Sequence, residues 1–152
     1  MKDLWPDQSS ENGMKTPATV MKEQVETIAQ KTNNHVYADV ARADVYIPNN
    51  QGLFMYELLF KTPARPRYSY SHFFMTYDIE FYPVEFYISD EQMHHDLELF
   101  LGKTVRGPIP AKSEEEFVEI LDQILRSEDT QKVINSLAMS NGGRNNGSVK
   151  AQ

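Results

Sequence analysis

The sequence predicts an α+β domain, with an N-terminal helix, about four mostly antiparallel strands, and then two or three C-terminal helices packed on one face of the sheet. Three observations predict this class. Apolar residues recur at helical spacing near both ends of the chain and at strand spacing between them. The strands form one run, without the strand–helix alternation that is typical of parallel sheets. The stretch 68–89 is rich in tyrosine and phenylalanine, which favours a place at the centre of the sheet.

The composition is that of a single globular domain. A chain of 152 residues with 40% apolar residues is long enough and apolar enough to bury a real core. We expect the domain to span residues 17–139, between a flexible segment 1–16 and a disordered tail 140–152 that is rich in Gly, Asn and Ser. The sequence contains no cysteine, which excludes disulfides and thiolate metal sites.

Charge and hydropathy restrict the expected partners and location. The net charge of −7 favours solubility and disfavours nonspecific binding to polyanions. No apolar run has the length of a signal-peptide core or of a membrane helix. A cytoplasmic protein without a membrane partner is therefore expected.

Residues 17–32 are predicted to form the first helix, because apolar residues recur there at i, i+4, i+7 and i+8. Thr16 before Pro17 suits a helix start, since threonine caps free amides and proline fits the first helical position. The pair Asn33–Asn34 is predicted to end the helix.

The first strand is predicted within residues 35–48, where apolar residues alternate on two different parities. A single strand cannot show both parities to one core. Either a bulge near Val40 and Ala41 switches the face, or a tight turn at residues 42–44 splits the run in two. We favour the bulge, followed by a turn at residues 49–52.

Residues 53–61 are predicted to form the partner strand, and apolar residues on both of its faces predict cover on both sides. The aromatic stretch then divides into strands at 69–78 and 83–89. Pro83 marks an edge, a bulge or a break, because proline cannot donate to a sheet ladder. The side chains predicted to face the core from these two strands are Phe73, Met75, Tyr77, Val84, Phe86 and Ile88.

Capping-box sequences predict two further helix starts. Ser89 is predicted to cap one helix, which Gly102 ends. Ser113 is predicted to cap the next, with acidic residues crowding its first turn, where the helix dipole favours them. Residues 127–129 are predicted to open a last short helix.

Candidate binding residues lie where the proline-interrupted loop 61–67 meets the aromatic stretch. They are Arg65, Arg67, Tyr68, Tyr70 and His72, and the last three share a strand face opposite to the predicted core face. Arg and Tyr are enriched at protein-binding hot spots, which favours a protein partner. The same patch suits single-stranded nucleic acid, with bases stacked on the rings, and this is the alternative. A plain basic loop beside packed tyrosines is the third interpretation.

A helix start with two histidines is a weaker candidate site. Glu91 and Glu98 lie three or four positions from His94 and His95, a spacing that can hold a metal ion, so a metal-dependent enzyme at this helix start is a further alternative. Adjacent histidines point about 100° apart around a helix, which disfavours a shared ion. Ordinary (i, i+4) pairing on a solvated helix face also explains the pattern. We therefore predict no metal, no cofactor and no catalytic residue.

Motifs for a nucleophile elbow, a phosphate loop or a dinucleotide fold are absent from the sequence. The sequence therefore predicts a small binding protein of the adaptor, chaperone or inhibitor type. We expect it to act through protein–protein contact rather than as an enzyme.

Overall fold

The computed structural model describes residues 15–43 and 53–142, and it confirms the α+β class. In these residues five strands form one sheet in the order β1-β2-β3-β4-β5, each antiparallel to the next. The strands are β1 (Tyr37–Arg42), β2 (Phe54–Lys61), β3 (Ser69–Tyr77), β4 (Val84–Tyr87) and β5 (Ile109–Ala111). The sheet is thus a meander with one strand more than predicted.

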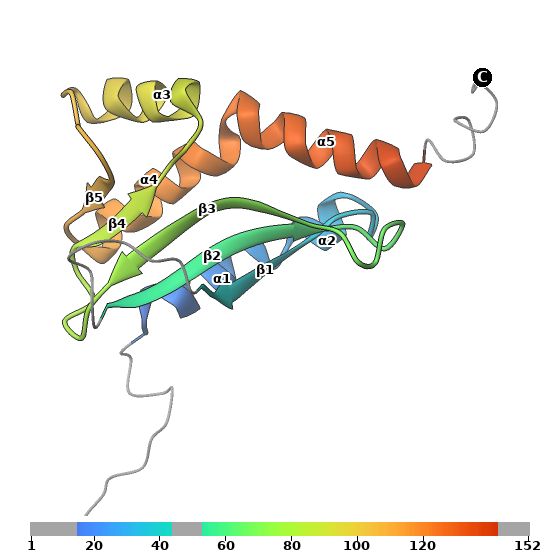
Figure 1. Cartoon of the computed structure of the whole chain (residues 1–152), viewed down its shortest axis with the longest axis horizontal. Coiled ribbons are helices and arrows are strands. Elements are labelled where there is room, and N and C mark those ends of the chain that lie inside the picture. The colour runs from blue at the N-terminus through green and yellow to red at the C-terminus, as the bar shows by residue number, and fades with distance from the viewer. Residues whose placement is uncertain (1–14, 44–52, 143–152) are drawn as a thin grey trace, which may run out of the picture.

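The helices pack against this sheet and against one another. They are α1 (Pro17–Val25), α2 (Ile28–Lys31), α3 (Glu91–Leu101), α4 (Glu114–Arg126) and α5 (Glu128–Gly142). Figure 1 shows α1 and α4 behind the sheet, and α5 running toward the loop between β2 and β3. Buried apolar side chains from α1, α3, α4 and α5 join those of the strands in one core.

The start of α1 is as predicted. Thr16 accepts a hydrogen bond from the amide of Thr19 at 3.2 Å, and proline is the first helical residue. The prediction of one continuous helix over 17–32 is wrong, because a turn separates α1 from α2. Asn33 and Asn34 take φ angles of 53° and 65°, and this left-handed conformation ends α2 as predicted.

The β-bulge lies in β3 rather than in β1. The pairing of β1 with β2 keeps a continuous register, so the bulge predicted near Val40 and Ala41 is wrong. The pairing of β2 with β3 shifts between Leu58 and Leu59, which makes His72 the extra residue of β3. A bulge of this kind bends its strand and increases the local twist.

This bulge changes which side chains share a face of β3. Tyr70 pairs with Phe60, and Phe73 pairs with Leu58. Side chains directly opposite each other in an antiparallel pair lie on the same face, and Phe60 and Leu58 are both buried in the core. Tyr70 and Phe73 therefore face the core together. The prediction that Tyr70 and His72 lie opposite to the core face is wrong.

The predicted core of the aromatic stretch is otherwise confirmed. Five of its six side chains are buried, namely Phe73, Met75, Tyr77, Val84 and Phe86. The sixth, Ile88, is half-buried and packs against the core. The ring of Phe86 stacks on that of Phe117 in α4, with 5.4 Å between the ring centroids. This contact packs α4 against β4.

β4 covers only part of β3. Three residue pairs join the two strands, and they involve only residues 74–76 of β3, which runs from Ser69 to Tyr77. Within the described part of the chain, residues 69–73 therefore have no strand beside them on the β4 side. β5 pairs with the far edge of β4 and buries Ile109 and Ala111. Its three residues are too few to show an alternating pattern in the sequence.

The two predicted capping boxes differ in outcome. At α3 the cap is Asp90, whose carboxylate accepts a hydrogen bond from the amide of Met93 at 2.8 Å, so the prediction of Ser89 is wrong. At α4 the cap is Ser113, which accepts from the amide of Glu116 at 3.1 Å, as predicted.

α3 ends at Gly102, as predicted, with a φ of 75°. α5 is 15 residues long, so the prediction of a short last helix is wrong. Most of the predicted flexible segment 1–16, of the tail 140–152 and of the turn at 49–52 lies outside the described residues. In the described residues no helix is long and apolar enough to cross a membrane.

Candidate functional site

The basic loop between β2 and β3 is partly held by the protein itself. The Nζ atom of Lys61 lies 3.1 Å from Oδ2 of Asp39, and the Nε atom of Arg65 donates to Oγ of Ser140 over 3.1 Å. Arg67 is exposed, and 45% of Tyr68 is exposed. Arg67 and Tyr68 are therefore the members of the predicted patch that the fold leaves most available to a partner.

The other two aromatic members of the predicted patch lie in or against the core. Tyr70 is half-buried and packs against the core, and burial raises the pKa of its phenol above the usual value. His72 is only 5% exposed, and burial lowers the pKa of its imidazole below the usual value. The structure therefore does not bring the five predicted binding residues together on one open surface.

The buried imidazole of His72 belongs to a hydrogen-bond network at the α4–α5 junction. Its Nε2 atom lies 2.7 Å from Oγ1 of Thr130, whose hydroxyl also lies 2.6 Å from the carbonyl oxygen of Ile124. A carbonyl only accepts, so the Thr130 hydroxyl donates to Ile124 and His72 Nε2 donates to Thr130. The Nδ1 atom of His72 then carries the lone pair, and it is buried without a hydrogen-bond partner in the described residues.

A groove of about 620 Å³ lies where β3 and β4 separate beneath α3. It is lined by residues 71–74 of β3, residues 87–89 at the end of β4, Glu91, His94, His95 and Glu98 of α3, and Gly107 and Pro108. Its volume is within the range of ligand pockets in proteins. The groove was not predicted from the sequence.

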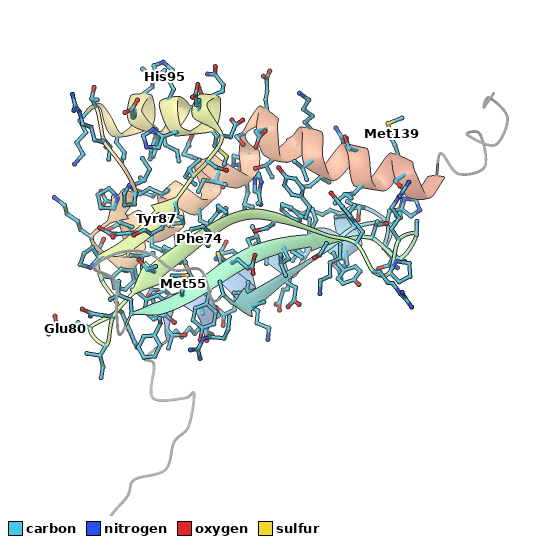
Figure 2. All side chains as sticks on the ribbon, in the orientation of Figure 1. Met55, Phe74, Glu80, Tyr87, His95 and Met139 are labelled. Atoms are coloured by element: carbon cyan, nitrogen blue, oxygen red, sulfur yellow. The ribbon has the colours of Figure 1, made fainter. Side chains whose placement is uncertain are left out.

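The floor of the groove is aromatic. The rings of Phe74 and Tyr87, which are paired residues of β3 and β4, stack with 5.0 Å between their centroids and 11° between their planes. Figure 2 shows the two side chains together on β3 and β4, below α3. Both belong to the face of the sheet that is turned away from Met75 and Phe86, because side chains alternate along a strand. The floor therefore presents a flat apolar surface to any occupant.

The wall of the groove is α3 together with the loop that follows it. Nε2 of His94 lies 2.9 Å from the carbonyl oxygen of Gly107, and Oε2 of Glu98 accepts a hydrogen bond from the amide of Val105 at 2.9 Å. The carbonyl can only accept, so Nε2 of His94 carries a proton and donates. These two bonds hold the loop against α3 and so fix the position of this wall of the groove.

Both histidines of α3 lie close to the carboxylate of Glu98. Glu98 lies 3.8 Å from Nδ1 of His94 and 3.6 Å from Nδ1 of His95. Among the residues that the structure describes, no three His, Asp or Glu side chains come together as metal ligands. The arrangement is that of a loop clamp, in which His94 and Glu98 bind backbone groups.

Acidic residues and histidines line the groove. Its lining includes Glu91 and Glu98 but no lysine or arginine. Glu91 is exposed, and its carboxylate makes no hydrogen bond or ion pair with the other described residues, whereas the carboxylate of Glu98 is held by the clamp. Lys103 and Arg106 are exposed in the loop after α3 and do not line the groove.

Comparison with protein-family models, with curated proteins and with solved structures finds no match to this chain. The fold and the geometry of the surface are therefore the basis for inferring a function.

Proposed function

We propose that the protein is a binding protein that acts through protein–protein contact, and that its partner docks on α3 and the groove beside it. The observation that carries this proposal is the exposure of two large apolar side chains on α3. Leu99 is 68% exposed and Phe100 is 43% exposed. Single exposed apolar residues are common, but a pair beside an apolar groove is typical of an interaction site.

The geometry of α3 supports docking over the helix and the groove together. Met93 and Leu97 are buried on the side of the helix that joins the core. Glu91, His95 and other residues of a second side line the groove. Leu99 lies four residues after His95, so the two side chains are neighbours on the helix surface. A partner that enters the groove would therefore also contact Leu99.

The predicted patch just before the start of β3 is a further candidate for contact with a partner. Arg67 and Tyr68 are exposed there, and side chains of these two types are enriched at hot spots. His72 is buried, so a partner would reach it only through the groove that it lines.

Affinity capture with matched variants tests the proposal. The immobilised baits are the full wild-type chain, Leu99→Glu and Met139→Glu, exposed to lysate of the cells that produce the protein. Met139 is the control, because it is 69% exposed on α5, like Leu99 on α3, and does not line the groove. In Figure 2 it projects away from the body of the protein.

We expect a protein that is captured by the wild type and by Met139→Glu and lost with Leu99→Glu. With the captured protein purified, Leu99→Glu should weaken its affinity by about tenfold or more, as a charge at a hot spot does. A partner that all three baits retain equally would contradict docking on α3. Capture of no protein would contradict the proposed function itself.

A further inference from the structure

We propose that the groove receives an extended, positively charged segment of the partner, which adds as a strand to the free edge of β3. This inference rests on the proposed function and specifies the chemistry of the partner. Three features carry it: an unpaired strand edge, an aromatic floor beside that edge, and an acidic wall without lysine or arginine.

The unpaired edge lies inside the groove. β4 pairs only with residues 74–76 of β3, and residues 71–73 line the groove directly. Four consecutive residues of one strand, 71–74, lie along the cavity, so the groove follows the backbone rather than one side-chain face. A strand edge has amide and carbonyl groups ready to pair with another extended chain, and strand addition is a common mode of peptide recognition.

The bulge at His72 explains why this edge is open. It sits two residues from Phe74, where the pairing with β4 ends. Because a bulge bends and twists its strand, β3 turns away from the line of β4 at this point. The chain after Tyr87 then leaves the sheet and enters α3, which begins at Glu91. The groove is the space between these two diverging paths.

The floor of the groove suits an apolar side chain of the added segment. An incoming strand directs alternate side chains to opposite faces, so one or two of them would lie over the stacked rings of Phe74 and Tyr87. Burial of an apolar side chain against aromatic rings supplies affinity, and main-chain pairing supplies the register. The half-buried Ile88 and Pro108 extend the same apolar lining.

The charge of the groove wall determines which peptide segments can bind in the groove. Glu91 and Glu98 line the groove, and no lysine or arginine of the described chain does so. The carboxylate of Glu91 is exposed and makes no ion pair within the described residues, so a cation of the occupant can pair with it. An occupant with lysine or arginine beside its apolar residue complements this wall, whereas an acidic occupant meets like charge.

Synthetic peptides test both parts of the inference on the full chain. The probes are three capped peptides: Lys-Val-Phe-Val-Lys, its acidic counterpart Glu-Val-Phe-Val-Glu, and the basic peptide with N-methyl groups on its three apolar residues. Each is titrated at pH 8, where imidazoles are in general largely neutral. Binding is followed by amide chemical shifts of the isotope-labelled protein, which also locate the bound peptide.

We expect the basic peptide to shift the amides of residues 71–74 and 87–89. The acidic peptide should bind about fivefold more weakly or worse, because of its charge. The N-methylated peptide should lose binding, because its three central amides cannot donate. No binding of the basic peptide, shifts that fall elsewhere, equal binding of the acidic peptide, or undiminished binding of the N-methylated peptide would each overturn the inference.

A pair of matched variants tests the acidic wall. Glu91→Gln should weaken the basic peptide by about two- to fivefold, the loss expected for one exposed ion pair. Glu119→Gln removes an equally exposed carboxylate from α4, outside the groove, and should leave the affinity unchanged. Equal effects of the two variants would show that only the overall charge matters and would overturn the role of the wall.

Failure of this inference is distinguishable from failure of the proposed function. Leu99 does not line the groove, so Leu99→Glu should impair capture of the partner while the five-residue peptide still binds. A captured partner with no peptide binding refutes the strand-addition mode alone. Peptide binding without a captured partner refutes the proposed function, whereas the strand-edge site remains supported.

Discussion

The Nε2 atom of His72 lies 2.7 Å from Oγ1 of Thr130, and the two residues are 58 positions apart in the sequence. This contact joins the bulge of β3 to the first turn of α5. Thr130 is fully buried, and His72 is nearly so. The bond is therefore shielded from solvent, so water would not replace a partner that is lost. It holds in place a part of β3 that lines the groove.

Replacing Thr130 should show the strength of this link. Thr130→Val keeps the shape of the side chain but removes the hydroxyl, which leaves a buried imidazole nitrogen without its partner. We expect the free energy of unfolding to fall by about 1–3 kcal/mol, measured by urea denaturation. Thr130→Ser, which keeps the hydroxyl and loses one methyl group, should cost about 1 kcal/mol or less. A valine variant as stable as the wild type would contradict the bond.

The same histidine should make stability depend on pH. Burial lowers the pKa of folded His72, and the carboxylates of Asp129 and Asp90 oppose this shift without reversing it. Because the unfolded chain has the higher pKa, it binds the extra proton first as the pH falls. Stability from neutral His72 is therefore complete above the unfolded pKa of about 6.5 and declines as the pH falls below it, until the folded pKa is passed.

Denaturation of wild type and His72→Gln at several pH values between 5 and 8 measures this contribution. The difference in unfolding free energy between the two proteins should be constant near pH 8 and should shrink below pH 6.5. One titrating proton limits the slope to about 1.4 kcal/mol per pH unit. The carboxylates titrate in both proteins, so they cancel in the difference. Parallel curves for the two proteins would contradict a buried neutral His72.

Alternation and helical spacing predict most of the fold because they report which face of an element is buried. Phe73, Met75 and Phe86 are in the core, as their parity predicts. The strong amphipathic pattern of α4 likewise predicts its burial against the sheet, and Phe117 is fully buried there. These are local patterns, and they need no knowledge of which strand lies beside which.

The candidate site could not be predicted in the same way, because it depends on pairings between distant residues. Parity counted from Phe73 places Tyr70 and His72 on the outer face, but the bulge at His72 reverses that assignment. No residue type in this segment marks a bulge. The end of β4 pairing at Phe74 is equally a property of the register, so the open edge and its groove have no signature in the sequence.

The caps of α3 and α4 offer a direct comparison of sequence pattern with structure. Asp90→Ala should destabilise the protein by about 1 kcal/mol, because it removes the acceptor for the amide of Met93. Ser89→Ala should change the stability by no more than about 0.5 kcal/mol, although Ser89 has the better capping-box sequence. Ser113→Ala, at α4, should cost about 1 kcal/mol. Urea denaturation of the three variants measures this, and a larger loss for Ser89 than for Asp90 would contradict the assigned cap.

The clamp between α3 and its following loop should depend on Glu98 and not on Glu91. Oε2 of Glu98 accepts the amide hydrogen of Val105, and Glu98 is a part-buried side chain. Glu98→Ala removes this acceptor, so the amide of Val105 should exchange its hydrogen faster, and the unfolding free energy should fall by about 1–2 kcal/mol. Glu91→Ala is the matched control, since Glu91 lies on the same helix and its carboxylate bonds to no described residue.

Amide hydrogen exchange followed by NMR measures the clamp at the single residue Val105. His94→Ala removes the second bond of the clamp, to Gly107, and its effect should not simply add to that of Glu98→Ala, because Nδ1 of His94 lies 3.8 Å from Oε2 of Glu98. Faster exchange at Val105 in Glu98→Ala but not in Glu91→Ala is the expected pattern. Equal protection of Val105 in the wild type and in Glu98→Ala would mean that the loop keeps its place without the clamp, and the fixed wall of the groove would then need another cause.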